Sequence, residues 1–404
     1  MITKENLKQI IISQKEGIMK ADNGITRDKL KEIKLIDSFA IIISGIRRCG
    51  KSTISRQILK NEKNFYYLNL EDPRLDGFEL SDFNKADEIF LELYGSGGIY
   101  FFDEIQTIDK WEKYIRFLAD KKSKILITGS NASLLSKELG TKLTGRHISY
   151  ELFPFSYNEF LEFFNLNPNK ESYERFLFEG GFPEYLEKKE DRLLNELLND
   201  VLMRDIVSRF RIKNISTLKK LAIYLITNVG KEFSYNSLKK MLEVKSVQSI
   251  INYISYLEDA YLIFTMPLFS YSYKKQLVNA KKVYSIDNGL SSINSVSFSK
   301  DKGIMFENSV FLQLKRKYKE IFYFKKNREC DFIVKEQEKI KYAIQICYEL
   351  NEDNKKREIE GLIEAMEELK LKEGLIITLN QTDSFEIGDK KIKVLPVWRW
   401  LLEE

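Results

Sequence analysis

Short apolar runs alternate with segments of helical periodicity over the first 130 residues of the chain. The apolar runs predict strands at residues 39–44, 65–70, 98–102 and 124–128. Between and after them, residues 52–60, 82–93 and 111–120 repeat their apolar positions at the helical period. This spacing is typical of an α/β fold with a parallel sheet and helices on both faces.

The pattern changes twice after the predicted sheet. Residues 157–210 are largely helical in pattern and are interrupted by Gly180-Gly181-Phe182-Pro183. Helices are then expected at 216–228, 235–242 and 246–259, followed by strands at 261–268 and 282–286. Three helices followed by a β-ribbon is the order of a winged helix.

The last hundred residues predict a separate small α/β unit. A helix is expected at 303–318 and another at 355–369. The strands are expected at 322–324, 330–334, 342–347, 375–379 and 393–396. Upstream of the first sheet, residues 1–36 predict one or two amphipathic helices with a break near 22–24.

Composition narrows the functional classes. The 404 residues include 65 basic and 60 acidic ones, so the net charge of +5 does not by itself indicate a polyanionic partner. Basic runs such as Lys281–Lys282 are expected to be solvated. The three cysteines lack metal-ligand spacing and His147 is the one histidine, which argues against zinc sites and hydrolase triads. No apolar stretch is long enough for a membrane span, and we expect a cytoplasmic protein.

A phosphate-binding motif follows the first predicted strand. The segment Gly45-Ile-Arg-Arg-Cys-Gly-Lys-Ser52 fits G-x-x-x-x-G-K-[ST] at every fixed position. The glycines allow consecutive backbone N–H groups to face an anion, and the helix that follows adds its positive end. Lys51 would reach the β- and γ-phosphates of ATP, and Ser52 would hold Mg²⁺. The predicted nucleotide-binding residues are Gly45, Ile46, Arg47, Arg48, Cys49, Gly50, Lys51, Ser52 and Thr53. Arg47, Arg48 and Cys49 have no assigned role, and we expect them to be solvated loop residues.

Two acids stand at the end of the third predicted strand. They follow four large apolar residues, in the order Ile99-Tyr-Phe-Phe-Asp103-Glu104. Ligands of parallel sheets bind at the carboxyl ends of strands, so we expect both acids near the phosphates. Asp103 would bind Mg²⁺ through water, and Glu104 would polarise the attacking water. The pair therefore predicts NTP hydrolysis.

Polar residues elsewhere are candidates for assisting this reaction. The fourth predicted strand ends in Thr128-Gly-Ser-Asn131, and Ser130 or Asn131 would project toward the γ-phosphate. Arg146 follows a loop and is a candidate arginine finger, with a plain surface arginine as the alternative. Whether Arg146 would act on its own subunit or a neighbour stays open.

These motifs resemble the archaeal and bacterial AAA-type ATP-binding proteins. The marks are the Gly45–Thr53 loop, Phe102-Asp-Glu-Ile-Gln106, Thr128-Gly-Ser-Asn131, Thr144-Gly-Arg146 and Gly180-Gly-Phe-Pro-Glu184, and Arg204-Asp205 and Phe306-Glu307 also match. The resemblance implies an AAA+-like P-loop core, a winged helix, and a C-terminal domain similar to PD-(D/E)XK restriction endonucleases. It assigns Asn131 the sensor role and Arg146 the finger role. The expected domains are a helical segment at 1–36, the ATPase core at 37–152, a helical lid at 153–212, the winged helix at 213–300 and the nuclease-like domain at 301–404.

The C-terminal domain lacks part of the PD-(D/E)XK nuclease motif. Glu307 and Asp331 match the first two acids of the resemblance, but Gln345-Ile-Cys347 stands where that pattern has E-x-K. An amide is a poorer ligand for a hard cation, and cysteine does not carry an ammonium charge. Glu349 lies on the same face of the predicted strand, yet the lysine is missing. We therefore expect no DNA cleavage.

The predicted winged helix does not decide between DNA and protein as its partner. Lys245, Ser246, Gln248 and Asn252 at the start of its third helix suit contacts to double-stranded DNA. Protein pairing is the alternative, and a homo-oligomer or protein partner fits equally well. The sequence favours a Mg²⁺-dependent AAA-type ATPase over an ATP-gated regulator or scaffold with little turnover.

Overall fold

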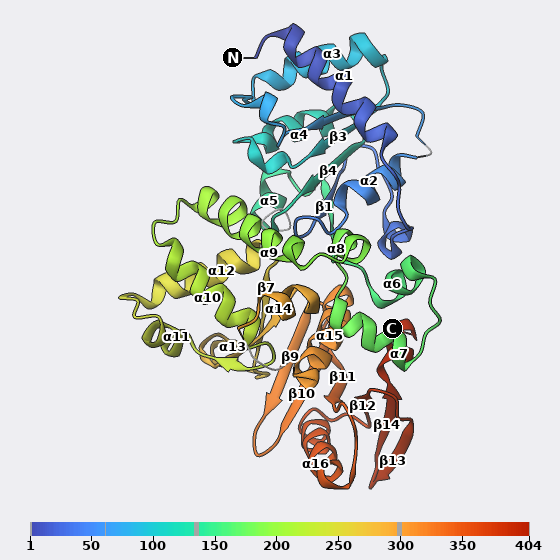
Figure 1. Ribbon diagram of the computed structural model, residues 1–404, viewed down its shortest axis with the longest axis vertical. Coiled ribbons are helices and arrows are strands. Elements are labelled where there is room, and N and C mark those ends of the chain that lie inside the picture. Colours follow the sequence, from blue (N-terminus) through green and yellow to red (C-terminus); the bar gives the residue numbers. More distant parts are fainter. Residues whose placement is uncertain (1, 61, 133–136, 297–300, 404) are drawn as a thin grey trace. The chain divides into compact units, whose positions relative to one another are not determined.

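The computed structural model describes residues 2–60, 62–132, 137–296 and 301–403 (Figure 1). The chain divides into two compact units, residues 1–153 with 259–261 and residues 154–258 with 262–404. Each unit has a hydrophobic cluster of its own. Across the described ranges, no helix has the length and apolar character needed to cross a membrane.

The first unit contains a parallel sheet of five strands in the order β2-β3-β4-β1-β5. The strands are β1 (Ala40–Ser44), β2 (Phe65–Asn69), β3 (Ile99–Asp103), β4 (Ile125–Gly129) and β5 (His147–Glu151). The helices are α1 (Lys4–Lys20), α2 (Lys51–Leu59), α3 (Asp82–Tyr94), α4 (Trp111–Asp120) and α5 (Lys137–Lys142), with 3-10 turns at Asp28–Glu32, Pro73–Leu75 and Ile105–Thr107. The predicted α/β fold with a parallel sheet is confirmed.

Burial explains why the central strands form where they do. All five residues of β1, β3 and β4 are buried, as expected when helices cover both faces of a parallel sheet. Helix α1 presents Leu7, Ile10 and Ile11 to the same core, where it packs against β2 and α3. The N-terminal helix is therefore part of the sheet unit.

The second unit begins with helices and continues with a small antiparallel sheet. The helices are α6 (Tyr157–Phe164), α7 (Lys170–Glu179), α8 (Pro183–Lys188) and α9 (Asp191–Asp200), which runs into a π-helical stretch at Val201–Ser208, then α10 (Ile215–Thr227), α11 (Tyr235–Met241), α12 (Val247–Asp259), α13 (Tyr273–Val278) and α14 (Asn288–Asn294). The strands β6 (Glu232–Phe233), β7 (Ile263–Pro267) and β8 (Lys281–Ser285) pair in the order β6-β8-β7.

The glycine pair that interrupts the helices has a steric reason. A Cβ atom on Gly181 would lie 2.4 Å from the carbonyl oxygen of Phe155, and Gly180 has a φ of +71°. The Gly181 N–H donates to Oδ2 of Asp287 at 2.6 Å. Asp287 also caps α14 by accepting from the Leu290 N–H at 2.8 Å. Gly180-Gly181 therefore lets the chain pass close to a buried carboxylate.

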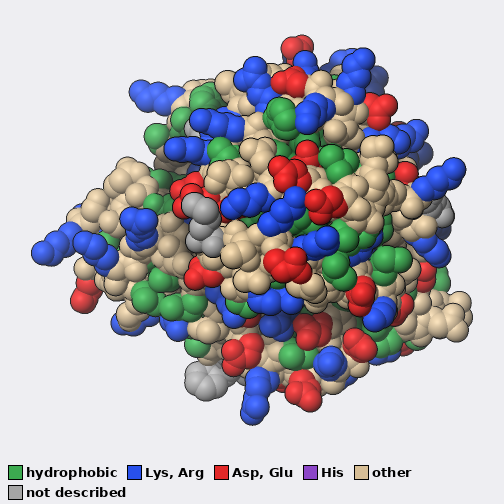
Figure 2. Space-filling model, turned by 90° about the horizontal axis from the view of Figure 1, so that it is seen from above, with side chains coloured by type: hydrophobic (Ala, Val, Ile, Leu, Met, Phe, Trp, Pro, Cys, Tyr) green, Lys and Arg blue, Asp and Glu red, His purple; other side chains and the backbone are tan. Residues whose placement is uncertain are grey.

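The rest of the second unit contains a mixed six-stranded sheet in the order β13-β14-β12-β11-β10-β9. Its strands are β9 (Glu320–Lys325), β10 (Glu329–Glu336), β11 (Lys339–Ile346), β12 (Glu373–Thr378), β13 (Asp383–Ile387) and β14 (Lys390–Pro396). Helices α15 (Lys302–Lys317), α16 (Glu352–Glu368) and α17 (Val397–Glu403) accompany it, and α16 packs on β10, β11 and β12. Figure 2 shows basic and acidic side chains interspersed over one face of the molecule.

Candidate functional site

The glycine-rich loop joins β1 to α2 in the first unit. A Cβ atom on Gly45 would lie 2.1 Å from the carbonyl oxygen of Leu152, so only glycine fits there. Gly50 caps α2 with a φ of 100°, a left-handed conformation that favours glycine. Helix α2 follows at once, so its positive N-terminal end faces the loop.

A buried arginine, Arg27, holds this loop from the N-terminal side. Its Nη1 donates to the Cys49 carbonyl at 2.7 Å, and its Nη2 donates to the Phe153 carbonyl at 2.8 Å. A Cβ atom on Gly50 would lie 2.7 Å from the same Nη1. Sequence reasoning missed Arg27, because no local pattern links it to a loop twenty residues further along.

The expectation that Cys49 is a solvated loop residue is wrong. Cys49 is fully buried, and burial raises the pKa of its thiol. The Sγ atom lies 3.4 Å from the Leu152 carbonyl oxygen. Arg47 is also largely shielded and donates to Glu71 at 3.1 Å. These residues fix the shape of the loop.

Lys51 and Glu104 face each other across the site. The Lys51 Nζ donates to the Gly45 and Ile46 carbonyls at 3.0 and 3.2 Å, and it lies 3.4 Å from Oε1 of Glu104. Burial would raise the pKa of Glu104, but the charge of Lys51 and hydrogen bonds from Gln106 and Ser130 outweigh it and lower the pKa. Glu104 is therefore an ionised carboxylate beside an ammonium group.

Ser52 and Asp103 form the second contact between α2 and β3. The Ser52 hydroxyl donates to Oδ2 of Asp103 at 3.0 Å, and the Thr128 hydroxyl donates to the other carboxylate oxygen. Burial, followed by the nearby charge of Glu104, raises the pKa of Asp103. A hydroxyl and a carboxylate in contact are hard oxygen ligands of the kind that Mg²⁺ binds.

The end of β4 lies between these two elements in the sheet. The Ser130 N–H donates to Oε2 of Glu104 at 3.0 Å, and the Glu104 N–H donates to the Thr128 hydroxyl at 3.3 Å. Asn131 is buried, and its carbonyl accepts from the Ser44 hydroxyl at 2.8 Å. The structure thus brings the loop, the acid pair and the end of β4 together.

Arg146 does not join this group within the chain. Its carbonyl accepts from the Ala40 N–H at 3.1 Å, at the amino end of β1, whereas the phosphate loop follows the carboxyl end. Four residue steps along β1 separate the two ends by about 13 Å. Its guanidinium pairs with Asp120 at 2.5 Å and is 43% exposed. Within its own chain, Arg146 therefore lies away from the phosphate loop.

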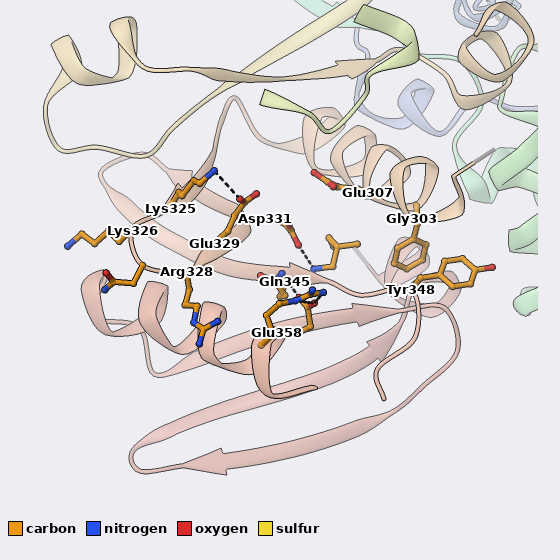
Figure 3. A pocket seen from close by; sticks show the side chains of 14 residues that line it. Gly303, Glu307, Lys325, Lys326, Arg328, Glu329, Asp331, Gln345, Tyr348 and Glu358 are labelled. Atoms are coloured by element: carbon orange, nitrogen blue, oxygen red, sulfur yellow. Dashed lines mark hydrogen bonds and ion pairs between the residues drawn. The ribbon is translucent and has the colours of Figure 1, made fainter. Parts of the chain in front are cut away.

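A second cluster lies in a cavity of about 520 Å³ in the second unit (Figure 3). Figure 3 shows Glu307 of α15 facing Asp331 of β10, with Gln345 and Glu358 on the other side of Asp331. The Gln345 Nε2 donates to Oε2 of Glu358 at 2.7 Å. Glu349 is exposed and lies beyond the end of β11, so it does not replace the missing carboxylate.

One basic residue beside this cavity was not expected there. Lys282 of β8 is 4% exposed, so the expectation that the Lys281–Lys282 run is solvated is wrong for it. Its ammonium group approaches Glu307, Glu329 and Asp331. No sequence pattern indicates this contact, because it depends on packing between distant segments.

The first unit defines a class. A glycine-rich loop after β1 and an acid pair at the end of β3, with β4 between the two strands, are typical of P-loop nucleotide-binding proteins. Residues 37–161 match the model of an AAA domain. Residues 170–298 and 302–400 match two domains of unknown function, DUF8612 and DUF4143. Residues 37–161 are therefore a nucleotide-binding domain of the AAA type.

The chain belongs to the family of the uncharacterized protein MJ1544 of Methanocaldococcus jannaschii. The two are 39% identical over 100% of this chain and 96% of that protein. An uncharacterized protein of Haemophilus influenzae is 29% identical over 90% of this chain and 94% of its own length. Among solved structures, Cdc6p from Pyrobaculum aerophilum overlaps 72% of this chain and 91% of its own, with 11% identity and a TM-score of 0.26.

Proposed function

We propose that the protein binds ATP with Mg²⁺ and hydrolyses it to ADP and phosphate. The observation that carries the proposal is the convergence of Lys51, Ser52, Asp103 and Glu104 at the carboxyl edge of one sheet. Each of these side chains belongs to a different task in phosphoryl transfer to water. An arrangement that only bound nucleotide would have no need of an ionised carboxylate at position 104.

The donor set fits a magnesium–nucleotide complex. Ser52 and Asp103 already share a hydrogen bond, and Thr128 orients the carboxylate from its other oxygen. Bound Mg²⁺ would neutralise phosphate charge as it develops. Lys51 would neutralise the β- and γ-phosphates, and the backbone N–H groups of the loop would hold them.

Glu104 would act as the base that orients water. Its low pKa keeps it ionised at neutral pH, and the Ser130 N–H and Gln106 hold its carboxylate in one position. Its contact with Lys51 also restrains that lysine without ligand. Phosphates that draw Lys51 away would free Glu104 for water. Asn131 follows Ser130 at the carboxyl end of β4, and we propose it as the sensor of the γ-phosphate.

We propose the finger role of Arg146 only for a neighbouring copy of the chain. Its exposure and its position at the far edge of the sheet fit action in trans. The proposal requires at least a transient homo-oligomer. It predicts that turnover per chain rises with protein concentration.

The second unit supports coupling of this cycle to a winged helix. Helices α10, α11 and α12 are followed by the β7–β8 ribbon, and β6 completes a three-stranded sheet. Lys245, Ser246, Gln248 and Asn252 are all exposed at the start of α12. The segment between β7 and β8 adds exposed tyrosines and lysines, namely Tyr271, Tyr273, Lys274 and Lys275. We favour double-stranded DNA as the partner, because these groups suit phosphate and base contacts.

The test combines turnover with DNA binding. Phosphate release is measured with Mg²⁺-ATP for wild type and Lys51→Ala, with and without duplex DNA. Fluorescence titration with DNA at two salt concentrations measures the partner separately, and affinity should fall as salt rises. ATP binding without turnover would instead favour a regulator or scaffold. Absence of DNA binding at low salt would instead favour a protein as the partner of the winged helix.

We further propose that the C-terminal domain does not cleave DNA. Gln345 offers a neutral amide oxygen where the nuclease pattern has a carboxylate, its Nε2 donates to Glu358, and Cys347 is a buried thiol where that pattern has a lysine. Metal-dependent cutting of a plasmid, abolished by Asp331→Ala, would contradict this proposal.

A further inference from the structure

Lys282 is a charged side chain held inside the second unit. It extends from β8 of the three-stranded sheet, and its side chain is 5% exposed. Its Nζ lies 2.7 Å from Oε1 of Glu329, 3.3 Å from Oε1 of Glu307 and 3.7 Å from Oδ1 of Asp331. A single ammonium group therefore lies among three carboxylates that come from two other elements, α15 and β10.

The carboxylates are oriented around that ammonium group. The Tyr284 hydroxyl donates to the same Oε1 of Glu307 at 2.7 Å, and the Ile346 N–H donates to Oδ2 of Asp331 at 2.8 Å. The remaining oxygen of Asp331 is the one that faces Lys282. Burial opposes the charge of Lys282, but the three carboxylates outweigh it and raise its pKa.

These residues do not fit a resident divalent cation as they stand. Within the described part of the chain, no three acidic, histidine or cysteine residues are arranged to hold a metal ion. The ammonium group occupies the point to which the three carboxylates converge. On the far side, the Gln345 Nε2 donates to Glu358, and its Oε1 is a neutral amide oxygen and a poorer ligand for a hard cation than a carboxylate. A cation entering here would meet a fixed positive charge.

We propose that Lys282 is a built-in counter-ion that takes the place of a divalent cation in this cavity. The C-terminal α/β part would then need no metal ion to balance its acidic cluster. Because the lysine comes from β8, the same contact fixes the small three-stranded sheet to α15 and β10. The inference concerns the second unit alone and does not depend on ATP hydrolysis.

Removal of the ammonium group should open a cation site. The three carboxylates would be left without their shared partner, at distances that suit a small divalent ion after modest closure. The probe is Mn²⁺, measured by electron paramagnetic resonance on the full chain without nucleotide. Lys282→Met keeps an unbranched side chain one atom shorter and removes the charge. Lys281→Met is the matched control, since Lys281 lies next to it on β8 and contacts the Tyr235 hydroxyl at 3.1 Å.

The expected result is one Mn²⁺ site in Lys282→Met that is at least tenfold tighter than any in wild type or Lys281→Met. Adding Asp331→Asn to Lys282→Met should abolish it, which separates this site from weak binding at the phosphate loop. A folded Lys282→Met protein with no gain in Mn²⁺ binding would overturn the proposal.

A second test uses the wild-type protein, so it does not depend on whether Lys282→Met folds. Wild type and Asp331→Asn should bind Mn²⁺ equally in this assay. If wild type holds a Mn²⁺ ion that Asp331→Asn loses, the cavity is a metal site and Lys282 does not replace the cation.

Discussion

Replacement of Glu104 by glutamine separates binding from catalysis at the proposed site. The carboxamide oxygen can still accept from the Ser130 N–H and from Gln106, so the local backbone should not change. The amide nitrogen would then face the Lys51 ammonium, which lies 3.4 Å from the present carboxylate. The variant therefore loses both the base and one restraint on Lys51.

The two losses have different consequences. Removal of a general base lowers kcat by about 10²–10⁴, which corresponds to roughly 3–5 kcal/mol of barrier. Loss of the contact with Glu104 would make Lys51 more available to the phosphates of ATP. The gain in binding free energy is about 1.5–3 kcal/mol at most, the value of a hydrogen bond to a charged group. ATP affinity should thus stay the same or increase by up to about a hundredfold. Turnover should fall while binding does not.

The assay pairs steady-state phosphate release with a fluorescent-ATP titration. Glu88→Gln is the matched control, because Glu88 lies on the surface of the same unit and pairs only with Lys4 at 3.1 Å among the contacts of its carboxylate given by the structure. It should match wild type in both measurements. If Glu104→Gln keeps kcat within about threefold of wild type, less than 1 kcal/mol of barrier, Glu104 is not the base and the reasoning fails.

Three further predictions follow from other parts of the structure. Gly181→Ala should destabilise the second unit by about 1–3 kcal/mol in urea unfolding, because its Cβ would meet the Phe155 carbonyl at 2.4 Å; an unchanged midpoint would contradict the steric account. Burial raises the pKa of Asp287 to about 6, so stability should fall as pH rises from about 4 to 6, by about 3 kcal/mol in total. Asp287→Asn should remove that slope, and identical pH profiles would refute it. Mixing Arg146→Ala with Lys51→Ala should restore part of the turnover that each lacks, whereas no recovery would remove the trans role.

Much of the first unit could be predicted from sequence because its central strands are buried on both faces. Such strands read as unbroken apolar runs, as in Ala40–Ser44 and Ile99–Asp103. The strand His147–Glu151 was missed for the opposite reason. It lies at an edge of the sheet, is only half-buried, and mixes polar with apolar residues. The exposed edge strand Asp383–Ile387 was missed on the same grounds.

The residues of the candidate sites also differ in whether the sequence could predict them. Lys51 and Glu104 belong to motifs whose local geometry is set within a few residues, so the sequence could locate them. The contacts of Arg27 with Cys49 and of Lys282 with Glu307 join segments that are 22 and 25 residues apart. Such contacts follow from how strands and helices pack, and no periodicity in the sequence reports them.

The central claim is that the site around Lys51 and Glu104 hydrolyses ATP. Single-turnover conversion of ATP to ADP, with protein in excess over nucleotide, tests it most directly. We predict that wild type forms ADP only when Mg²⁺ is present, and that Lys51→Ala forms none under the same conditions. Equal ADP formation by wild type and Lys51→Ala, or ATP that stays bound and intact in wild type, would contradict the account.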